Sequence, residues 1–415
     1  MRLKTMPPAG ALRLRDGRGP YAGAGRWDGS GEVACVCQRD PTGHNCVHYG
    51  RDSGLCVRYS VLNGRWVGWF CGKEFFVRVY AYWNNKGGTG KTSLVFQSLC
   101  FYADQHPEER ILAIDVCPQA NLSELLFGGL TNQGSQRLLL QQGEIPRKTL
   151  GGYFEKRLPS PFTMPAVTPS DYISTPNNFN SAVPSNVDLI AGDPLLELQS
   201  NAISTLANTQ IPGTNSWLKV IDWIRDLIES LDGKYDTIFI DSNPSFSIYT
   251  QIALSAADRL VLPVMADDSS RRAIQNAFSL IYGLKLPSEI YSTYAFATRL
   301  QAAERVLPKV HLIAKNRLTQ YMGSASAYAA VLRSIDDDID GLLEDHPEMF
   351  TFTKVEDGVV DIRDFQTTGV VAFARGCPFY AQRSGRFDVM GKRVRVDPNY
   401  LTNCVEAVQG LVAHL

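Results

Sequence analysis

Hydrophobic and polar positions follow two patterns from residue 77 onward. Short runs of apolar and β-branched residues, typical of buried strands, occur at 77–83, 111–115, 235–241, 256–264 and 309–315. Between them lie segments with the apolar spacing of helices, such as 94–106 and 216–231. Strands that alternate with helices predict an α/β domain over 77–415, with a mostly parallel twisted sheet and helices on both faces.

Two stretches interrupt this alternation. Residues 142–184 are rich in Pro, Ser, Thr and Asn, which is typical of a surface insertion. We expect a second insertion at 320–366. Its acidic run at 335–340 lacks the glycine and the terminal glutamate of a calcium loop, so it predicts an acidic helix face.

Residues 1–76 differ from the rest in composition. They hold 13 of the 34 glycines and 11 basic against 6 acidic residues, and show little periodicity. A disordered extension, or a start codon assigned too early, explains this composition. A zinc site is the alternative, although the spacing lacks the usual pair of closely spaced cysteines. Its ligands would be Cys35, Cys37, His44, Cys46 and His48.

Composition and charge narrow the class of protein. With 44% hydrophobic and 20% charged residues, the chain is typical of a globular protein. A net charge of −1 means that any nucleic-acid surface must come from local clustering. No apolar run approaches the roughly 18 residues that span a bilayer, and no signal peptide is evident, so we expect a cytoplasmic protein without a membrane partner.

A glycine-rich loop stands between the first predicted strand and helix. Residues 84–93 read Asn-Asn-Lys-Gly-Gly-Thr-Gly-Lys-Thr-Ser. The glycines let the backbone curl around phosphates, so that N–H groups and the helix N-terminus face the anion. Lys91 would bind the β- and γ-phosphates, and the Thr92 hydroxyl would ligate Mg²⁺. The motif predicts ATP and Mg²⁺ as cofactors, with nucleotide contacts from Lys86, Gly87, Gly88, Thr89, Gly90, Lys91, Thr92 and Ser93.

Lys86, ahead of the double glycine, makes this loop resemble the deviant Walker A motif of the ParA/MinD/Soj family of P-loop ATPases. The chain is most similar to the ParA-type partition members. The resemblance implies an ATP-dependent homodimer in which Lys86 reaches across the interface to the partner's phosphates. It also implies a slow ATPase, with Lys86 and Lys91 in catalysis.

Two acidic motifs extend the resemblance. Asp115 ends the strand at 111–115 and matches the first aspartate of the family's second motif, which implies a catalytic role. Asp241 ends the strand at 235–241 and matches the Walker B aspartate that holds Mg²⁺. Asn316 follows the strand at 309–315, where the family contacts adenine.

The chain departs from the family at Cys117, which stands where the second aspartate of that motif is found. A thiol accepts a proton from water only when it is ionised, and its reference pKa is about 8.5. Slow or absent hydrolysis and near-normal hydrolysis supported by another group, such as Asp115, both stay open.

A basic cluster lies near the C-terminus. Six basic residues face one acid between 375 and 395, and such a patch can bind polyanions. A solvated basic face is the alternative. The residues expected to contact DNA are Arg271, Arg272, Arg383, Arg386, Lys392, Arg393 and Arg395.

The family resemblance implies DNA partitioning or cargo positioning. We therefore expect nonspecific DNA binding in the ATP state, nucleoid association, and a ParB-like or other stimulating protein partner. The alternative is a nucleotide-gated regulatory binding protein with weak or no hydrolysis, which Cys117 keeps open. A membrane-cycling member would need a basic amphipathic C-terminal helix, and residues 400–415 contain no Lys or Arg.

Overall fold

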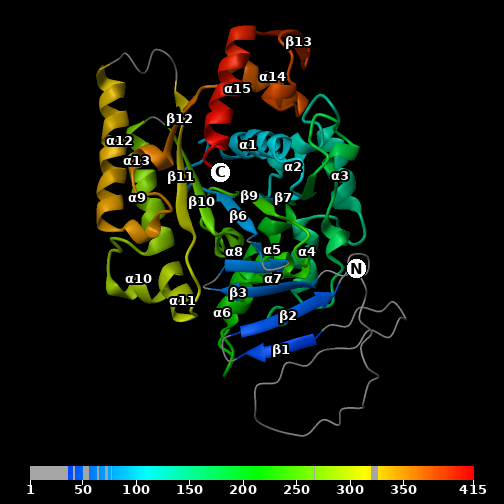
Figure 1. Ribbon diagram of the computed structural model, residues 1–415, viewed down its shortest axis with the longest axis vertical. Coiled ribbons are helices and arrows are strands. Elements are labelled where there is room, and N and C mark those ends of the chain that lie inside the picture. The colour runs from blue at the N-terminus through cyan, green and yellow to red at the C-terminus, as the bar shows by residue number, and fades with distance from the viewer. Residues whose placement is uncertain are drawn as a thin grey trace, which may run out of the picture.

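The computed structural model describes the backbone of residues 36–40, 43–49, 56–62, 65–70, 73–75, 77–265, 267–318 and 326–415. From residue 77 onward it also describes the side chains, except those at 266, 268, 317 and 319–329. A seven-stranded parallel sheet forms the core of the fold (Figure 1). Its order is β12 (Val359–Arg363), β11 (Lys309–Leu318), β10 (Arg259–Met265), β6 (Arg78–Tyr82), β9 (Thr237–Ser242), β7 (Ile111–Val116) and β8 (Val187–Ile190).

Each strand contributes side chains to two hydrophobic cores, because successive side chains of a strand point to opposite faces of the sheet. In β6, Val79 and Ala81 belong to one core, whereas Tyr80 and Tyr82 belong to the other. Every position of β7 and β9 is buried, as expected for parallel strands covered on both faces. The predicted α/β class is therefore confirmed.

Helices cover both faces of the sheet. The core that contains Val79 is covered by α4 (Leu150–Arg157), α5 (Leu195–Asn208), α6 (Ser216–Ile221), α7 (Trp223–Ser230), α8 (Ile248–Ala256), α9 (Asp268–Tyr282), α11 (Phe296–Ala302) and α12 (Ser326–Asp345). The core that contains Tyr80 is covered by α1 (Lys91–Gln105), α2 (Asn121–Leu126), α3 (Gly134–Gly143), α14 (Gln366–Arg375) and α15 (Pro398–Val412). Two short helices, α10 (Glu289–Tyr294) and α13 (Val355–Gly358), complete the set. Within the described ranges, no helix is both long and apolar enough to cross a membrane.

The single helix expected over 216–231 is two helices. α6 and α7 are separated by Asp222, whose carboxylate pairs with Arg305 at 2.6 Å. The apolar spacing that continues through both helices gave no sign of this break.

Both expected insertions contribute to the fold more than their composition suggested. Within 142–184, Tyr153 and Phe154 of α4 are fully buried, and the Tyr153 hydroxyl donates to the Trp223 carbonyl at 2.7 Å. Residues 320–366 supply α12 and the edge strand β12, which pairs with β11. Neither stretch is only a surface loop.

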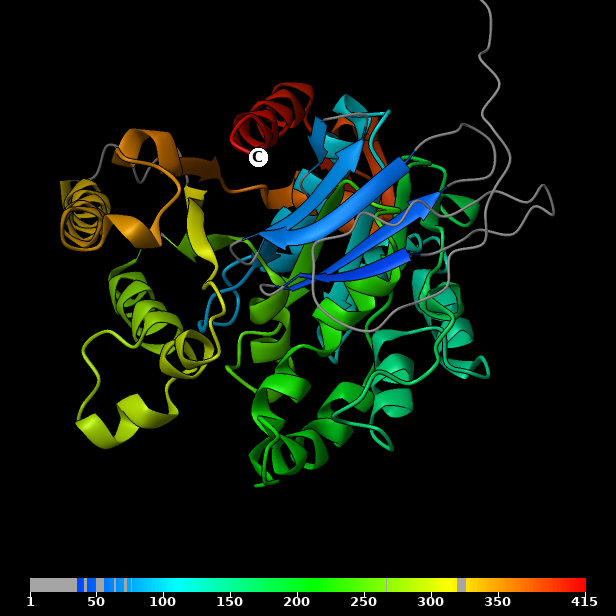
Figure 2. The ribbon, with the colours of Figure 1, turned by 60° about the horizontal axis from the view of Figure 1, so that its bottom comes forward.

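Two further sheets are small and antiparallel. A hairpin joins β13 (Gly385–Val389) to β14 (Lys392–Val396). Before residue 77 lie β1 (Val36–Asp40), β2 (Gly43–Tyr49), β3 (Cys56–Leu62), β4 (Arg65–Phe70) and β5 (Lys73–Phe75), drawn in blue in Figure 2. These strands lie within the segment 1–76, for which we expected a disordered extension or a start codon assigned too early. Residues 1–35 of that segment lie outside the described residues. The side chains of the five candidate zinc ligands, which all precede residue 77, lie outside the part of the chain whose side chains are described.

Candidate nucleotide-binding site

The loop between β6 and α1 has the backbone geometry of a phosphate cradle. Gly88 and Gly90 have φ of 75° and 83°, in the left-handed region that favours glycine. α1 begins directly after Gly90, and no side chain of the described residues caps its first turn. The uncapped end of this 15-residue helix presents N–H donors and the positive end of the helix dipole. The loop can therefore hold an anion.

Lys91 lies inside this loop and is 7% exposed. Its Nζ donates to the carbonyls of Asn84 and Lys86, each at 3.2 Å. Burial lowers the pKa of Lys91, and the carboxylate of Asp241 opposes this shift. A phosphate in the loop would offer the amine charge-assisted partners that are stronger than these carbonyls.

Two carboxyl groups meet at the ends of the central strands. Asp115 of β7 and Asp241 of β9 are directly paired in the parallel register. Asp115 is well satisfied, since it accepts from the Ser123 amide at 2.9 Å, the Ser123 hydroxyl at 2.7 Å and the Cys117 amide at 3.1 Å. Asp241 is 1% exposed, and neither of its oxygens has a hydrogen-bond partner among the described residues.

The shifted pKa values of Asp115 and Asp241 indicate that a cation would stabilise their ionised forms. Burial, and then repulsion by Asp115, raise the pKa of Asp241 to about 8, although the nearby Thr92 hydroxyl and Lys91 lower it. Burial raises the pKa of Asp115 to about 6, with the hydrogen bonds from Ser123 opposing it. A buried, unpaired carboxylate is costly unless it is protonated or neutralised by a positive charge. Carboxylate and hydroxyl oxygens suit Mg²⁺, so Asp241 and Thr92 fit the predicted metal ligands.

Cys117 lies beside these carboxyl groups. Burial, and then the charges of Asp115 and Asp241, raise the pKa of the Cys117 thiol to about 12. The thiol is therefore protonated at neutral pH and cannot take a proton from a water molecule.

Lys86 is held within its own chain. Its Nζ contacts both carboxylate oxygens of Asp267, at 2.9 and 2.7 Å, and the hydroxyl of Ser269. Asp267 also caps α9 by accepting from the Ser270 amide at 3.0 Å. Burial acts to raise the pKa of Asp267, but hydrogen bonds from Lys86 and the two serines outweigh it and lower the pKa to about 2. We did not predict Asp267, although Asp-Asp-Ser-Ser directly after a strand is a typical start of a helix.

Five of the seven basic residues predicted to contact DNA lie on or beside the hairpin. All five are exposed, and none of them forms an ion pair within the part of the chain that the structure describes. They are Arg383, Arg386, Lys392, Arg393 and Arg395. Arg386 stands directly opposite Arg395 in the register, and Arg393 stands opposite Asp388. Like charges directly opposite each other destabilise a strand pair, so an anion on this face would relieve the repulsion.

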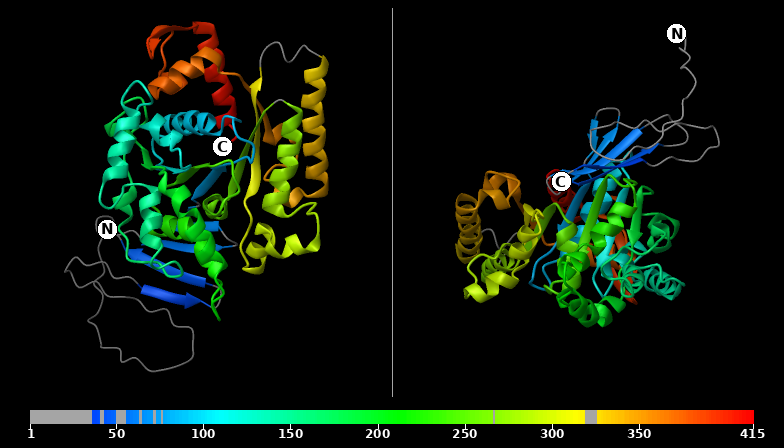
Figure 3. Two further views of the ribbon diagram at one scale, coloured as in Figure 1. Left: turned by 180° about the vertical axis from the view of Figure 1, so that it is seen from behind. Right: turned by 90° about the horizontal axis from the view of Figure 1, so that it is seen from below.

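Arg271 and Arg272 do not join this cluster. They lie on α9, which packs beside α12 on the side of the molecule away from the hairpin (Figures 1 and 3). Arg271 makes a two-point ion pair with Asp338 of α12, at 2.8 and 2.9 Å. We expected them to join the cluster because they follow a predicted strand. Instead, Arg271 is bound to the acidic face of α12.

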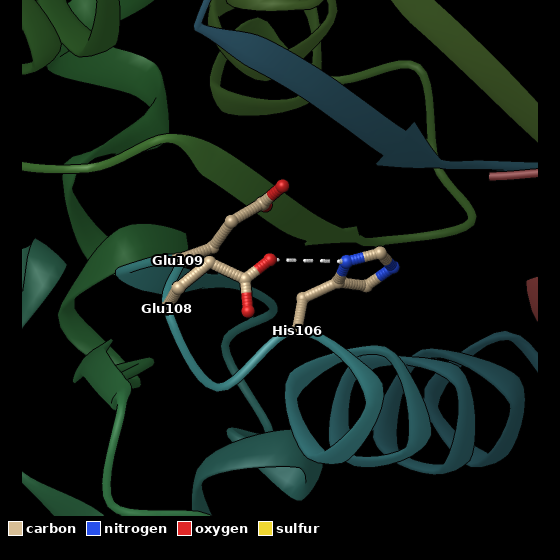
Figure 4. A group of neighbouring side chains, drawn as sticks. All are labelled: His106, Glu108 and Glu109. Atoms are coloured by element: carbon tan, nitrogen blue, oxygen red, sulfur yellow. Dashed lines mark ion pairs between the residues drawn. The ribbon is translucent and has the colours of Figure 1, made fainter.

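A group at the end of α1 resembles a metal site only in its composition. His106, Glu108 and Glu109 lie close together, and His106 pairs with Glu108 at 3.7 Å (Figure 4). However, Arg78 donates to one oxygen of Glu109, and Tyr102 and Thr237 donate to the other at 3.0 and 2.8 Å. Glu109 therefore already has partners on both oxygens.

Comparisons with known proteins agree with the fold. A family described as an AAA domain matches residues 77–289, which is more than half of the chain. An ATP complex of an aspartate-to-alanine variant of McdA from Cyanothece is similar over 81% of this chain and 96% of its own length, with 14% identity and a TM-score of 0.50. A plasmid partition protein from Borrelia burgdorferi B31 bound to AMPPNP is similar over 82% of this chain and 99% of its own, with 14% identity and a TM-score of 0.45. The chain therefore belongs to this AAA-domain family of P-loop ATPases, in its ParA/MinD group.

Proposed function

We propose that this chain is an ATP-dependent, dimerising ATPase that partitions DNA or positions a cargo on it. The observation that carries the proposal is the unpaired carboxylate of Asp241 beside Lys91 and Thr92, at the mouth of the phosphate loop. This arrangement suits a magnesium-bound nucleotide, since Asp241 and Thr92 would hold the ion and its charge would compensate the buried carboxylate.

Each element of the site has a role in this function. The glycines and the first turn of α1 bind the phosphates, and Lys91 turns from its two carbonyl partners to them. Mg²⁺, when bound, neutralises charge that develops on the transferred phosphoryl group. Asp115 fixes the segment from Cys117 to Ser123 next to the phosphates through its three hydrogen bonds. Asn316, near the end of β11, was expected to contact adenine.

Dimerisation gives Lys86 a second position. In the isolated chain it is bound to Asp267, and on ATP binding it would leave this partner for the phosphates of the other subunit. Exchange of one carboxylate for a more highly charged phosphate makes this transfer favourable. The hairpin then supplies a surface for DNA backbones, and a ParB-like or other protein partner would stimulate turnover. These features imply association with the nucleoid.

Cys117 supports the second candidate, a nucleotide-gated binding protein with little hydrolysis. Its protonated thiol cannot act as a general base, and general-base catalysis contributes about 10²–10⁴-fold to a rate. Binding and dimerisation do not need that base. The two candidates therefore share the same site and differ in the rate of turnover.

The test is binding of the full chain to nonspecific duplex DNA with Mg-ATP or Mg-ADP, at two salt concentrations. We expect salt-sensitive binding with ATP only, because phosphate contacts release counterions. Lys86→Ala should lose the ATP-dependent part. Arg271→Ala, which replaces a basic residue of α9 that pairs with Asp338 away from the hairpin, is the control and should bind DNA as the wild type does. If the protein binds ATP but does not bind DNA with either nucleotide, the proposed role in DNA partitioning is wrong. The search then moves to a protein cargo.

A further inference from the structure

Asn316 is packed directly against the phosphate loop. It lies within β11, two residues before the strand ends, and is 2% exposed. Its Nδ2 donates to the carbonyl of Thr89 at 2.8 Å. A Cβ added at Gly90 would lie 2.2 Å from that nitrogen. The amide of Asn316 therefore occupies the space that any side chain at Gly90 would need, and holds the loop at the peptide between them.

A second asparagine holds the start of the same loop. Asn84 is 1% exposed, and its Nδ2 donates to the carbonyl of Pro263 in β10 at 2.8 Å. Its Oδ1 accepts from the Lys86 amide at 2.9 Å. The loop is thus tied to β10 before its glycines and to β11 within them.

The end of β11 is itself anchored by residues of the 320–366 stretch. Lys315, next to Asn316, has a side chain that is 8% exposed. Its Nζ lies 3.0 Å from a carboxylate oxygen of Asp336 in α12 and 3.0 Å from one of Asp361 in β12. Only the lysine is buried, because the side chains of Asp336 and Asp361 are 36% and 60% exposed. The two ion pairs therefore orient the strand end, although exposed pairs stabilise a fold only modestly.

We propose that Asn316 is a positioning residue that sets the shape of the phosphate loop, and that Asp336 and Asp361 hold it in place through Lys315. This inference rests on the proposed nucleotide binding and differs from the expected adenine contact. A residue that shapes the loop affects every ligand with a phosphate chain. A residue that binds adenine affects only ligands that carry the base.

The experiment compares Mg-ADP with Mg-pyrophosphate, which has no base. Their affinities for the full-length protein are measured by calorimetry for the wild type, Asn316→Ala and Asn316→Asp. Asn316→Asp keeps the shape of the side chain but replaces the donor by a carboxylate that repels the Thr89 carbonyl. We expect Asn316→Ala to weaken both ligands by the same factor, about tenfold or 1.4 kcal/mol, and Asn316→Asp to weaken both further. Asn208→Ala, at an exposed site on α5, is the control and should change neither.

Loss of ADP affinity with unchanged pyrophosphate affinity would overturn the proposal in favour of an adenine contact. Unchanged affinity for both ligands would overturn it as well. If the wild type binds neither ligand, the proposed nucleotide site fails together with this inference. Thermal unfolding of each variant shows whether it is folded. If the Asn316 variants do not fold, Asp336→Asn takes their place, because it removes one ion-pair partner of Lys315. It should weaken the binding of both ligands by the same factor, smaller than that expected for Asn316→Ala. A different factor for each ligand would refute the proposed role.

Discussion

Replacing Asp241 by asparagine should stabilise the protein when no magnesium is present, although the residue belongs to the metal site. The unfolded carboxyl group ionises near pH 3.8, whereas in the folded protein its pKa is about 8. Between these values the folded state binds more protons than the unfolded state, so stability falls as pH rises through that window and is constant above it. At 1.36 kcal/mol per pKa unit, the ionised carboxylate costs roughly 4 kcal/mol at pH 7.

Asparagine removes this penalty but leaves a buried amide with unpaired hydrogen-bonding groups, which costs about 1–3 kcal/mol. We therefore expect a net gain of about 1–3 kcal/mol at pH 7, or a rise in Tm of several degrees. The assay is thermal unfolding in EDTA from pH 5 to pH 9. The difference in Tm between Asp241→Asn and the wild type should be absent near pH 5 and should grow up to pH 8. Mg-ADP in place of EDTA should then raise the Tm of the wild type more than that of the variant, which keeps the phosphate loop but lacks the metal carboxylate.

Asp115→Asn is the matched control, because its carboxylate already accepts three hydrogen bonds. An amide nitrogen there would face a backbone N–H, and this cost opposes the relief that comes from removing a carboxylate with a raised pKa. This variant should therefore gain less stability at pH 8 than Asp241→Asn does. The reasoning about Asp241 is refuted if Asp241→Asn is no more stable than the wild type at pH 8 in EDTA. A gain in stability that does not change with pH would refute it too.

Three further predictions concern turnover, dimerisation and DNA. Cys117→Asp should raise the steady-state rate of ATP hydrolysis at least tenfold, because it supplies a proton acceptor. The affinity for ADP, measured by calorimetry, should not change. An unchanged rate would mean that another group already accepts the proton from water. Asp267→Asn, which loosens the hold on Lys86, should increase the dimer fraction at a given ATP concentration by a few-fold in analytical ultracentrifugation, and a smaller fraction would contradict the role of Asp267 as a restraint. The double substitution Arg386→Ala with Arg395→Ala should lower the slope of log affinity for DNA against log salt by about 2, and an unchanged slope would remove the hairpin from the interface.

Much of the nucleotide site could be predicted from the sequence, because its residues are contiguous or end apolar strands. The loop at 84–93 and the carboxyl groups of Asp115 and Asp241 lie where the strand pattern placed them. The parallel register then brings the two acids together, since both strands end at the same edge of the sheet.

What could not be predicted depends on contacts between distant segments. The ion pair of Lys86 joins residues 181 positions apart, and the bond from Asn316 to Thr89 joins residues 227 apart. No local spacing reports such pairs. Composition also concealed the buried helix α4, because the Pro, Ser, Thr and Asn that follow it dominate the average of the stretch at 142–184.

The strand β12 has a consequence for how this fold tolerates truncation. Without it, β11 would be the outermost strand, with unpaired backbone groups over the part from Ile313 to Leu318 that now pairs with β12. An uncovered, apolar strand edge is a template on which other chains pair and aggregate. Removing the stretch at 320–366 to obtain a minimal ATPase would therefore expose this edge and yield insoluble protein. We therefore expect the stretch to guard the sheet edge against unspecific strand pairing, which is separate from its contacts near the phosphate loop.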